Sequence, residues 1–185
     1  MKINSFKDIN GDLVSLIKLD IKYLNDMWEY SKDPKLYEHF EFGPQQKISD
    51  TKKYLNNLIK KSNGVDSYWW FIQINRTNKV VGSLGIHGID NFRKTCEISY
   101  ALSPKFWGKG VFIQALKLAL KYLINDFHFY RFTALTSSNN IRSIESLKKI
   151  GFKEEGEFRD FYMRDNGTRF NATPLALLAS EYKEL

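Results

Sequence analysis

The stretch SPKFWGKGVFIQAL, residues 103–116, decides the fold of this 185-residue chain. It follows a run typical of a β-strand, CEISYAL (residues 96–102), and leads into a long apolar helix. Gly108 and Gly110 flank Lys109 at this junction. The first amides of a helix lack partners within it and carry partial positive charge. The junction is therefore either a tight strand-to-helix turn or a binding site for a phosphate.

The composition predicts a single globular domain over residues 1–185. The mass is 21.7 kDa and 43% of the residues are hydrophobic, so the chain is long enough to bury a core. No apolar run reaches the roughly 18 residues that a membrane span needs, and the first residues lack a signal-peptide pattern. The only cysteine, Cys96, excludes an intrachain disulfide, and His39 and His87 have no partners at metal-ligand spacing. We expect a cytoplasmic protein without a metal.

The net charge of +7 permits a polyanionic partner such as nucleic acid, an acidic surface or a phosphorylated cofactor. The lysines are spread along the chain, which argues against nucleic acid. A solvated basic surface without a specific partner explains the charge equally well.

Hydrophobic periodicity predicts helices first and then strands interrupted by two helices, which is one mixed α/β (α+β) layer fold. The first sixty residues are expected to be helical, with helices over residues 19–30 and from Ser49 or Asp50 onward. The later helices are expected over residues 108–125 and within 137–150. Strands are expected over residues 67–74, 79–87, 96–102, 130–136, 152–158 and 170–182, with a hairpin turn at DNGT, residues 165–168.

Alternation divides residues 96–102 into two faces. The side chains expected to face the core are Cys96, Ile98, Tyr100 and Leu102, and those on the other face are Glu97, Ser99 and Ala101. A carboxylate beside two small residues forms a shallow groove with one titratable group. Glu97 is therefore either a solvent-facing residue of an outer strand or a functional carboxylate.

Two neighbouring strand-to-helix junctions carry residues suited to ligand binding. KFWGKG, residues 105–110, has neither the Walker spacing nor the dinucleotide fingerprint, because Ile113 stands where the third glycine would be. Its short G-x-G aims several amides in one direction. TSSNNIRS, residues 136–143, has Asn139 or Asn140 in N-cap position and Ser143 one turn later.

These segments resemble the Gcn5-related N-acetyltransferase (GNAT) superfamily. KFWGKG is similar to its [QR]-x-x-G-x-[GA] acetyl-CoA loop. NNIRSIESLKKIGF, with Asn140, Ser143, Gly151 and Phe152, resembles the N-x-x-S…GF segment of the branch that includes RimJ/RimL-type ribosomal-protein acetyltransferases. GSLGIHGIDNFRKTCEISYAL resembles that branch's G-x-x-G…E-I-x-Y-x-L strand pair. The likeness extends over about residues 10–180.

The resemblance implies a GNAT fold: a mixed, mostly antiparallel central sheet flanked by helices, with an N-terminal helical pair and a late β-hairpin. It implies an acetyl-CoA-dependent N-acetyltransferase that acts on a primary amine, either a protein N-terminus or a small-molecule or sugar amine. Relatives often form dimers through strand edges, so a homodimer is compatible with it.

The resemblance also implies site residues. Glu97 would take a proton from the amine, directly or through water, and Ser143 would assist the leaving thiolate, since the second helix has no tyrosine. A backbone amide around Leu102 would stabilise the developing oxyanion. The residues expected to bind acetyl-CoA are Ala101, Leu102, Ser103, Lys105, Trp107, Gly108, Lys109, Gly110, Val111, Phe112, Asn140 and Ser143.

Several positions depart from the family pattern. Lys105 replaces the usual Gln or Arg, which keeps the charge but loses a planar fork. Phe112 and Ile113 replace small residues, and this crowding suggests a non-catalytic acyl-CoA-binding or sensing module as an alternative. A basic nucleic-acid-binding domain is the third interpretation. For the acceptor, the acidic loop residues Glu38 and Glu41, together with His39 and His87, are the candidates, although a solvated loop explains the first three equally well.

Overall fold

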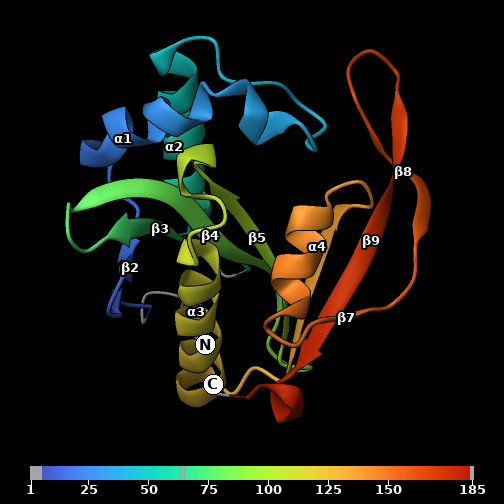
Figure 1. Ribbon diagram of the computed structural model, residues 1–185. Helices are drawn as coiled ribbons and strands as arrows, with labels where there is room; N and C mark the ends of the chain where they lie inside the picture. Colours follow the sequence, from blue (N-terminus) through green and yellow to red (C-terminus); the bar gives the residue numbers. More distant parts are fainter. Residues whose placement is uncertain (1–5, 63, 65, 184–185) are drawn as a thin grey trace.

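The computed structural model describes residues 6–62, 64 and 66–183, and their strands form a single nine-stranded sheet (Figure 1). The strand order is β1-β2-β3-β4-β5-β6-β9-β7, with β8 paired to β9. All pairings are antiparallel except that of β5 with β6. The strands are β1 Ile9–Asn10, β2 Val14–Lys18, β3 Tyr68–Ile74, β4 Lys79–Asp90, β5 Thr95–Leu102, β6 Arg131–Ser137, β7 Lys153–Glu154, β8 Phe158–Met163 and β9 Arg169–Leu178.

Helices cover both faces of the sheet (Figure 1). They are α1 Leu24–Ser31, α2 Ile48–Ser62, α3 Val111–Phe127 and α4 Ile141–Lys148, with short 3-10 turns at Ile21–Tyr23, Pro34–Tyr37, Pro104–Phe106 and Ala179–Glu181. One apolar core lies under α3, whose residues Ala115, Leu116, Ala119, Leu120 and Leu123 are fully buried at helical spacing. A second, smaller core lies under α1 and α2. The predicted mixed sheet, helical pair and late hairpin are confirmed.

Two local predictions were wrong. The first sixty residues are not all helical, because residues 14–18 form β2 and pair with β3 along its whole length. VSLIK is a short apolar run, and such a run has no period that separates a strand from a helix. The strand expected over residues 152–158 is broken into β7 and the start of β8. Gly156 lies between them with φ +132°, a conformation that does not continue a strand.

The parallel pair of β5 and β6 separates early. Its register contains only three pairs, the last of which is Glu97 with Thr133. The antiparallel pairing of β5 with β4 continues to Leu102. Beyond Glu97, β5 therefore leaves β6, and the gap between them opens next to the start of α3 and to α4 (Figure 1).

Candidate functional site

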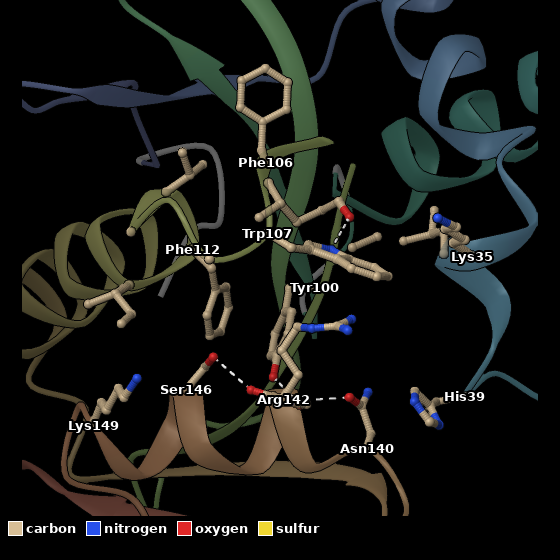
Figure 2. Close-up of a pocket in the computed structure, with 18 of the residues that line it drawn as sticks. Lys35, His39, Tyr100, Phe106, Trp107, Phe112, Asn140, Arg142, Ser146 and Lys149 are labelled. Carbon is tan, nitrogen blue, oxygen red and sulfur yellow. Dashed lines mark hydrogen bonds between the residues drawn. The ribbon is translucent and has the colours of Figure 1, made fainter. Parts of the chain in front are cut away.

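A pocket of about 190 Å³ lies where β5 and β6 separate (Figure 2). It is lined by the end of β5, the loop into α3, the first turn of α3, one face of α4, and the turn that follows α1. The lining residues are Lys35, Leu36, His39, Phe40, Tyr100, Ala101, Leu102, Phe106, Trp107, Gly108, Gly110, Val111, Phe112, Ile113, Asn140, Arg142, Ser143, Ser146 and Lys149. Segments distant in the sequence thus meet at one cavity.

The loop before α3 presents backbone donors to this pocket. Gly108 and Gly110 have φ of +72° and +76°, and a Cβ at either position would meet no atom within 4 Å. Glycine is needed there for the backbone conformation and not for space. The first three amides of α3 have no acceptor in the described part of the chain, and the next one bonds to the Gly110 carbonyl. These amides, at the positive end of a 17-residue helix, are donors of the kind that favour an anion.

The floor of the pocket holds a partly buried hydroxyl pair. Tyr100 Oη lies 2.5 Å from Ser143 Oγ, and the Ser143 amide donates to Asn140 Oδ1 at 3.2 Å. The Tyr100 ring packs on Phe112, with centroids 4.0 Å apart. Burial raises the pKa of Tyr100 to about 12, although the hydrogen bond with Ser143 lowers it in part. The phenol therefore keeps its proton at neutral pH and remains a donor.

Trp107 and Arg142 stack on each other and form another wall of the pocket. Trp107 Nε1 donates to the Leu102 carbonyl at 2.8 Å, which fixes the indole against the end of β5. The Arg142 guanidinium lies 3.9 Å from the centre of this ring. Figure 2 shows Arg142 extending from α4 toward Trp107. The pair links α4 to the loop before α3 across the pocket.

The comparisons with known proteins decide the family. A family model described as an acetyltransferase (GNAT) domain matches residues 14–153, which is most of the chain. The chain belongs to the GNAT acetyltransferase family. As a GNAT enzyme it is an acetyltransferase that uses acetyl-CoA as its co-substrate.

Individual relatives agree with this placement of the GNAT enzyme. It is 25% identical over 169 residues to the uncharacterized N-acetyltransferase p20 of Bacillus licheniformis, covering 91% of this chain and 94% of that protein. It is 31% identical over 91 residues to the [ribosomal protein uS5]-alanine N-acetyltransferase of Escherichia coli (strain K12), covering 45% and 47%. The microcin C7 self-immunity acetyltransferase MccE, solved in complex with acetyl-CoA and AMP, has a TM-score of 0.81 at 20% identity over 91% and 93% of the two chains, which shows the fold alone.

Most residues predicted for the acetyl-CoA site line the pocket of this GNAT enzyme. They are Ala101, Leu102, Trp107, Gly108, Gly110, Val111, Phe112, Asn140 and Ser143. Three others do not line it. The Ser103 amide donates to Val81 O at 2.8 Å, Lys105 Nζ pairs with Glu29 Oε1 at 2.9 Å, and Lys109 lies 5.5 Å from the Phe106 ring centre.

The cations that do line the pocket were missed by sequence reasoning. Lys35 comes from the turn after α1, and Arg142 and Lys149 come from α4 and its end. No local pattern marks them, because their approach to the pocket depends on how α1 and α4 pack against the sheet. Tyr100 was also missed, since alternation placed it on the core face. Its position on the face next to α3 is as expected, but its hydroxyl reaches Ser143.

The two predicted catalytic residues lie on opposite faces of the sheet. Ser143 lines the pocket, whereas Glu97 lies outside it and its side chain is 38% exposed. Glu97 Oε1 is 3.7 Å from His87 Nε2, and the same nitrogen is 2.7 Å from Ser99 Oγ. Ala101, which shares this face, packs against the core under α1 and α2.

The loop after α1 is attached to the β8–β9 hairpin. The Met163 amide donates to Glu41 Oε1 at 3.1 Å, and Arg164 Nη2 donates to the Glu38 carbonyl. Neither acidic residue lines the pocket, although His39 does. Burial lowers the pKa of His39. The predicted acidic patch therefore contacts the hairpin, and the pocket mouth beside it is basic.

Residues 6–62, 64 and 66–183 contain neither a cluster of metal-binding side chains nor a membrane-spanning helix. No three His, Cys, Asp or Glu side chains there are grouped so as to hold a metal ion. No helix among the same residues is long and apolar enough to cross a membrane.

Proposed function

We propose that the pocket binds acetyl-CoA with its pyrophosphate at the start of α3 and its thioester beside Tyr100 and Ser143, and that the enzyme acetylates a primary amine. The observation that carries this proposal is the presence, in one cavity, of unpaired helix amides and a protonated hydroxyl pair. The residues fit the ligand, because the two glycines leave open space in front of those amides. Arg142 and Lys149 add positive charge along the same wall.

When bound, acetyl-CoA supplies an acetyl group activated as a thioester. The residues of this chain would orient the thioester and donate a proton to the departing sulfur. The Tyr100 phenol keeps its proton at neutral pH because its pKa is raised to about 12, and its short hydrogen bond to Ser143 Oγ places a donor for the departing sulfur. Phe112 and Trp107 exclude water from that position with their rings.

The charge of the pocket bears on the acceptor amine. Its ionisable lining residues are Lys35, His39, Arg142 and Lys149, besides Tyr100. No Asp or Glu among the described residues lines the pocket, so its lining offers no carboxylate to a second cation of a polyamine. An amine whose remainder is neutral or anionic is therefore the better acceptor. This class includes protein N-termini and sugar amines.

Calorimetric titration with acetyl-CoA, CoA and dephospho-CoA tests the donor site. We expect micromolar binding of acetyl-CoA and CoA. Gly110→Ala should weaken it about fivefold or more, since a left-handed residue with a Cβ costs about 1–2 kcal/mol. Gly167→Ala is the matched control, because Gly167 also has a positive φ and open space but lies in the late hairpin. An absence of heat and of thermal stabilisation with all three ligands would overturn the donor site.

An acceptor panel tests the amine preference. N-terminal peptides, amino sugars and spermine are compared at one acetyl-CoA concentration, with CoA release as the readout. We expect peptides or amino sugars to react faster than spermine. The opposite ranking would show that the charge argument is wrong, and it would leave the donor site intact.

A further inference from the structure

We propose that His87 and Ser99 form a proton relay on the face of the sheet toward α1 and α2, which removes the proton of the acceptor ammonium, and that Glu97 stabilises the charged histidine. This inference rests on the proposed function. It differs from the sequence-based prediction, in which Glu97 itself takes the proton.

The first support is the position of Ser99 on β5. Ser99 directly precedes Tyr100, and neighbouring strand residues point to opposite faces of a sheet. Tyr100 Oη reaches Ser143 in the pocket, whereas Ser99 Oγ reaches His87 on the other face. Both residues lie beyond Glu97, where β5 has left β6. A reacting molecule in this gap therefore meets a proton donor on one face and a proton acceptor on the other.

The second support is the geometry of the relay. In the β4–β5 register His87 pairs with Glu97, and Gly85 pairs with Ser99. His87 Nε2 is 2.7 Å from Ser99 Oγ and 3.7 Å from Glu97 Oε1. One imidazole nitrogen thus lies within hydrogen-bond distance of a hydroxyl that can pass a proton, and a carboxylate lies 3.7 Å from the same nitrogen. Imidazole is also the side chain that ordinarily changes charge near neutral pH.

The third support is the way in which His87 is held. Its ring stacks with Trp69 at an interplanar angle of 10° and a centroid distance of 6.3 Å. The indole lies over Gly85, where an added Cβ would fall 2.2 Å from ring atoms. Because Gly85 has no side chain, the Trp69 ring can lie parallel to the His87 ring. The His87 and Glu97 side chains remain 36% and 38% exposed, so a substrate has access to them.

The ionisable neighbours do not compete for the role of base. Glu97 faces His87 from β5. Tyr162 lies on β8, and besides burial the negative charges of Glu97 and Glu41 contribute to raising its pKa. Burial raises the pKa of Tyr162 to about 12, so this phenol stays protonated at neutral pH. Glu41 accepts a hydrogen bond from the hairpin backbone. Imidazole is then the neutral base with a direct path through Ser99.

The ammonium loses one N–H bond as its proton moves to Ser99 Oγ, and the electron pair of that bond stays on nitrogen. The Ser99 hydroxyl gives its own proton to His87 Nε2, where a new N–H bond forms. The resulting imidazolium lies beside Glu97 and returns the proton to solvent after each turnover. The neutral amine is then a nucleophile.

The test compares pH profiles of kcat/KM for the wild type, His87→Gln, Ser99→Ala and Glu97→Gln. We expect His87→Gln and Ser99→Ala to lower kcat/KM about 10²-fold at neutral pH. The loss should shrink as the pH approaches the pKa of the amine, because the free amine no longer needs a base. Glu97→Gln should cause a smaller loss. His128→Asn is the control, since His128 is the third histidine of the chain and caps the far end of α3.

Chemical rescue adds a readout that a structural role would not change. Imidazole in the buffer should restore part of the activity of His87→Ala and none of that of Ser143→Ala. Unchanged acetyl-CoA binding by the His87 variants separates this test from failure of the donor site. The relay is wrong if His87→Gln and Ser99→Ala keep kcat/KM within threefold of the wild type while Glu97→Gln abolishes it. Ser99→Ala also decides the matter if the His87 variants do not fold.

Discussion

Replacing Tyr100 by Phe removes one oxygen atom from the floor of the pocket and leaves the ring in place. The ring keeps its contact with Phe112, at 4.0 Å between centroids. The stability lost is that of the hydrogen bond to Ser143, about 1 kcal/mol in unfolding free energy. The variant should therefore fold, and any large change in its kinetics belongs to the reaction.

The expected kinetic loss is larger than the stability loss. A positioned proton donor contributes about 10²–10⁴ to a rate, so we expect kcat of Tyr100→Phe to fall at least 10²-fold, which is about 2.7 kcal/mol in activation free energy. The KM for acetyl-CoA should change little, because the proposed pyrophosphate contacts are on α3. In the wild type, kcat should show no alkaline decline from Tyr100 up to about pH 10, since its pKa is raised to about 12.

A double-mutant cycle with Ser143→Ala tests whether the two hydroxyls act as a unit. The assay is the rate of CoA release at saturating acetyl-CoA and amine, with the melting temperature of each variant as a control. Residues that act together are strongly non-additive, so the double variant should be no more than a few-fold slower than the slower single variant. The reasoning is refuted if Tyr100→Phe keeps kcat within threefold of the wild type, or if the two losses multiply.

Two further predictions concern stability. Gly85→Ala places a Cβ 2.2 Å from the Trp69 ring and should cost about 1–3 kcal/mol in denaturant unfolding, whereas Gly43→Ala, with open space, should change stability by less than about 1 kcal/mol; equal effects would contradict the packing. The Glu29 carboxylate accepts a hydrogen bond from Lys79, which lowers the pKa of Glu29 from 4.5. The stability that this ion pair adds is therefore present above pH 4.5 and is lost as the pH falls through the pKa of Glu29 in the folded state. Unfolding of Glu29→Gln between about pH 3 and 6 should depend less on pH than that of the wild type, and identical slopes would argue against this ion pair.

Local patterns in the sequence were sufficient to predict the start of α3 and the cap of α4 that line the pocket. The glycines of KFWGKG predicted an amide-lined helix start because their requirement is set by their own φ angles. Asn140 caps α4 as expected, with its side chain accepting from Ser143. Alternation also placed Glu97 and Tyr100 on opposite faces of β5 correctly. Each of these features depends on residues within one turn or one strand.

The contacts between distant segments were beyond such patterns. The stacking of Arg142 on Trp107 joins residues 35 positions apart in the numbering, and it follows from the packing of α4. Lys35 reaches the pocket from the turn after α1, sixty residues before the start of β5. The proposed role of Tyr100 was hidden because an aromatic ring on the core face satisfies the hydrophobic pattern whether or not its hydroxyl is used. Strand β2 was missed because only its pairing with β3 distinguishes it from a helical turn.

Cys96, the first residue of the predicted strand CEISYAL, allows turnover of the enzyme to be measured with a thiol reagent. It is the only cysteine in the chain, it is 2% exposed, and burial raises the pKa of its thiol. Thiolates, and not thiols, react with disulfide reagents. A chromogenic disulfide reagent mixed with the folded enzyme should therefore report the CoA thiol released in each turnover and almost nothing from the protein. The same thiol becomes reactive when the core opens, so a single reagent measures turnover in the native enzyme and unfolding under denaturing conditions.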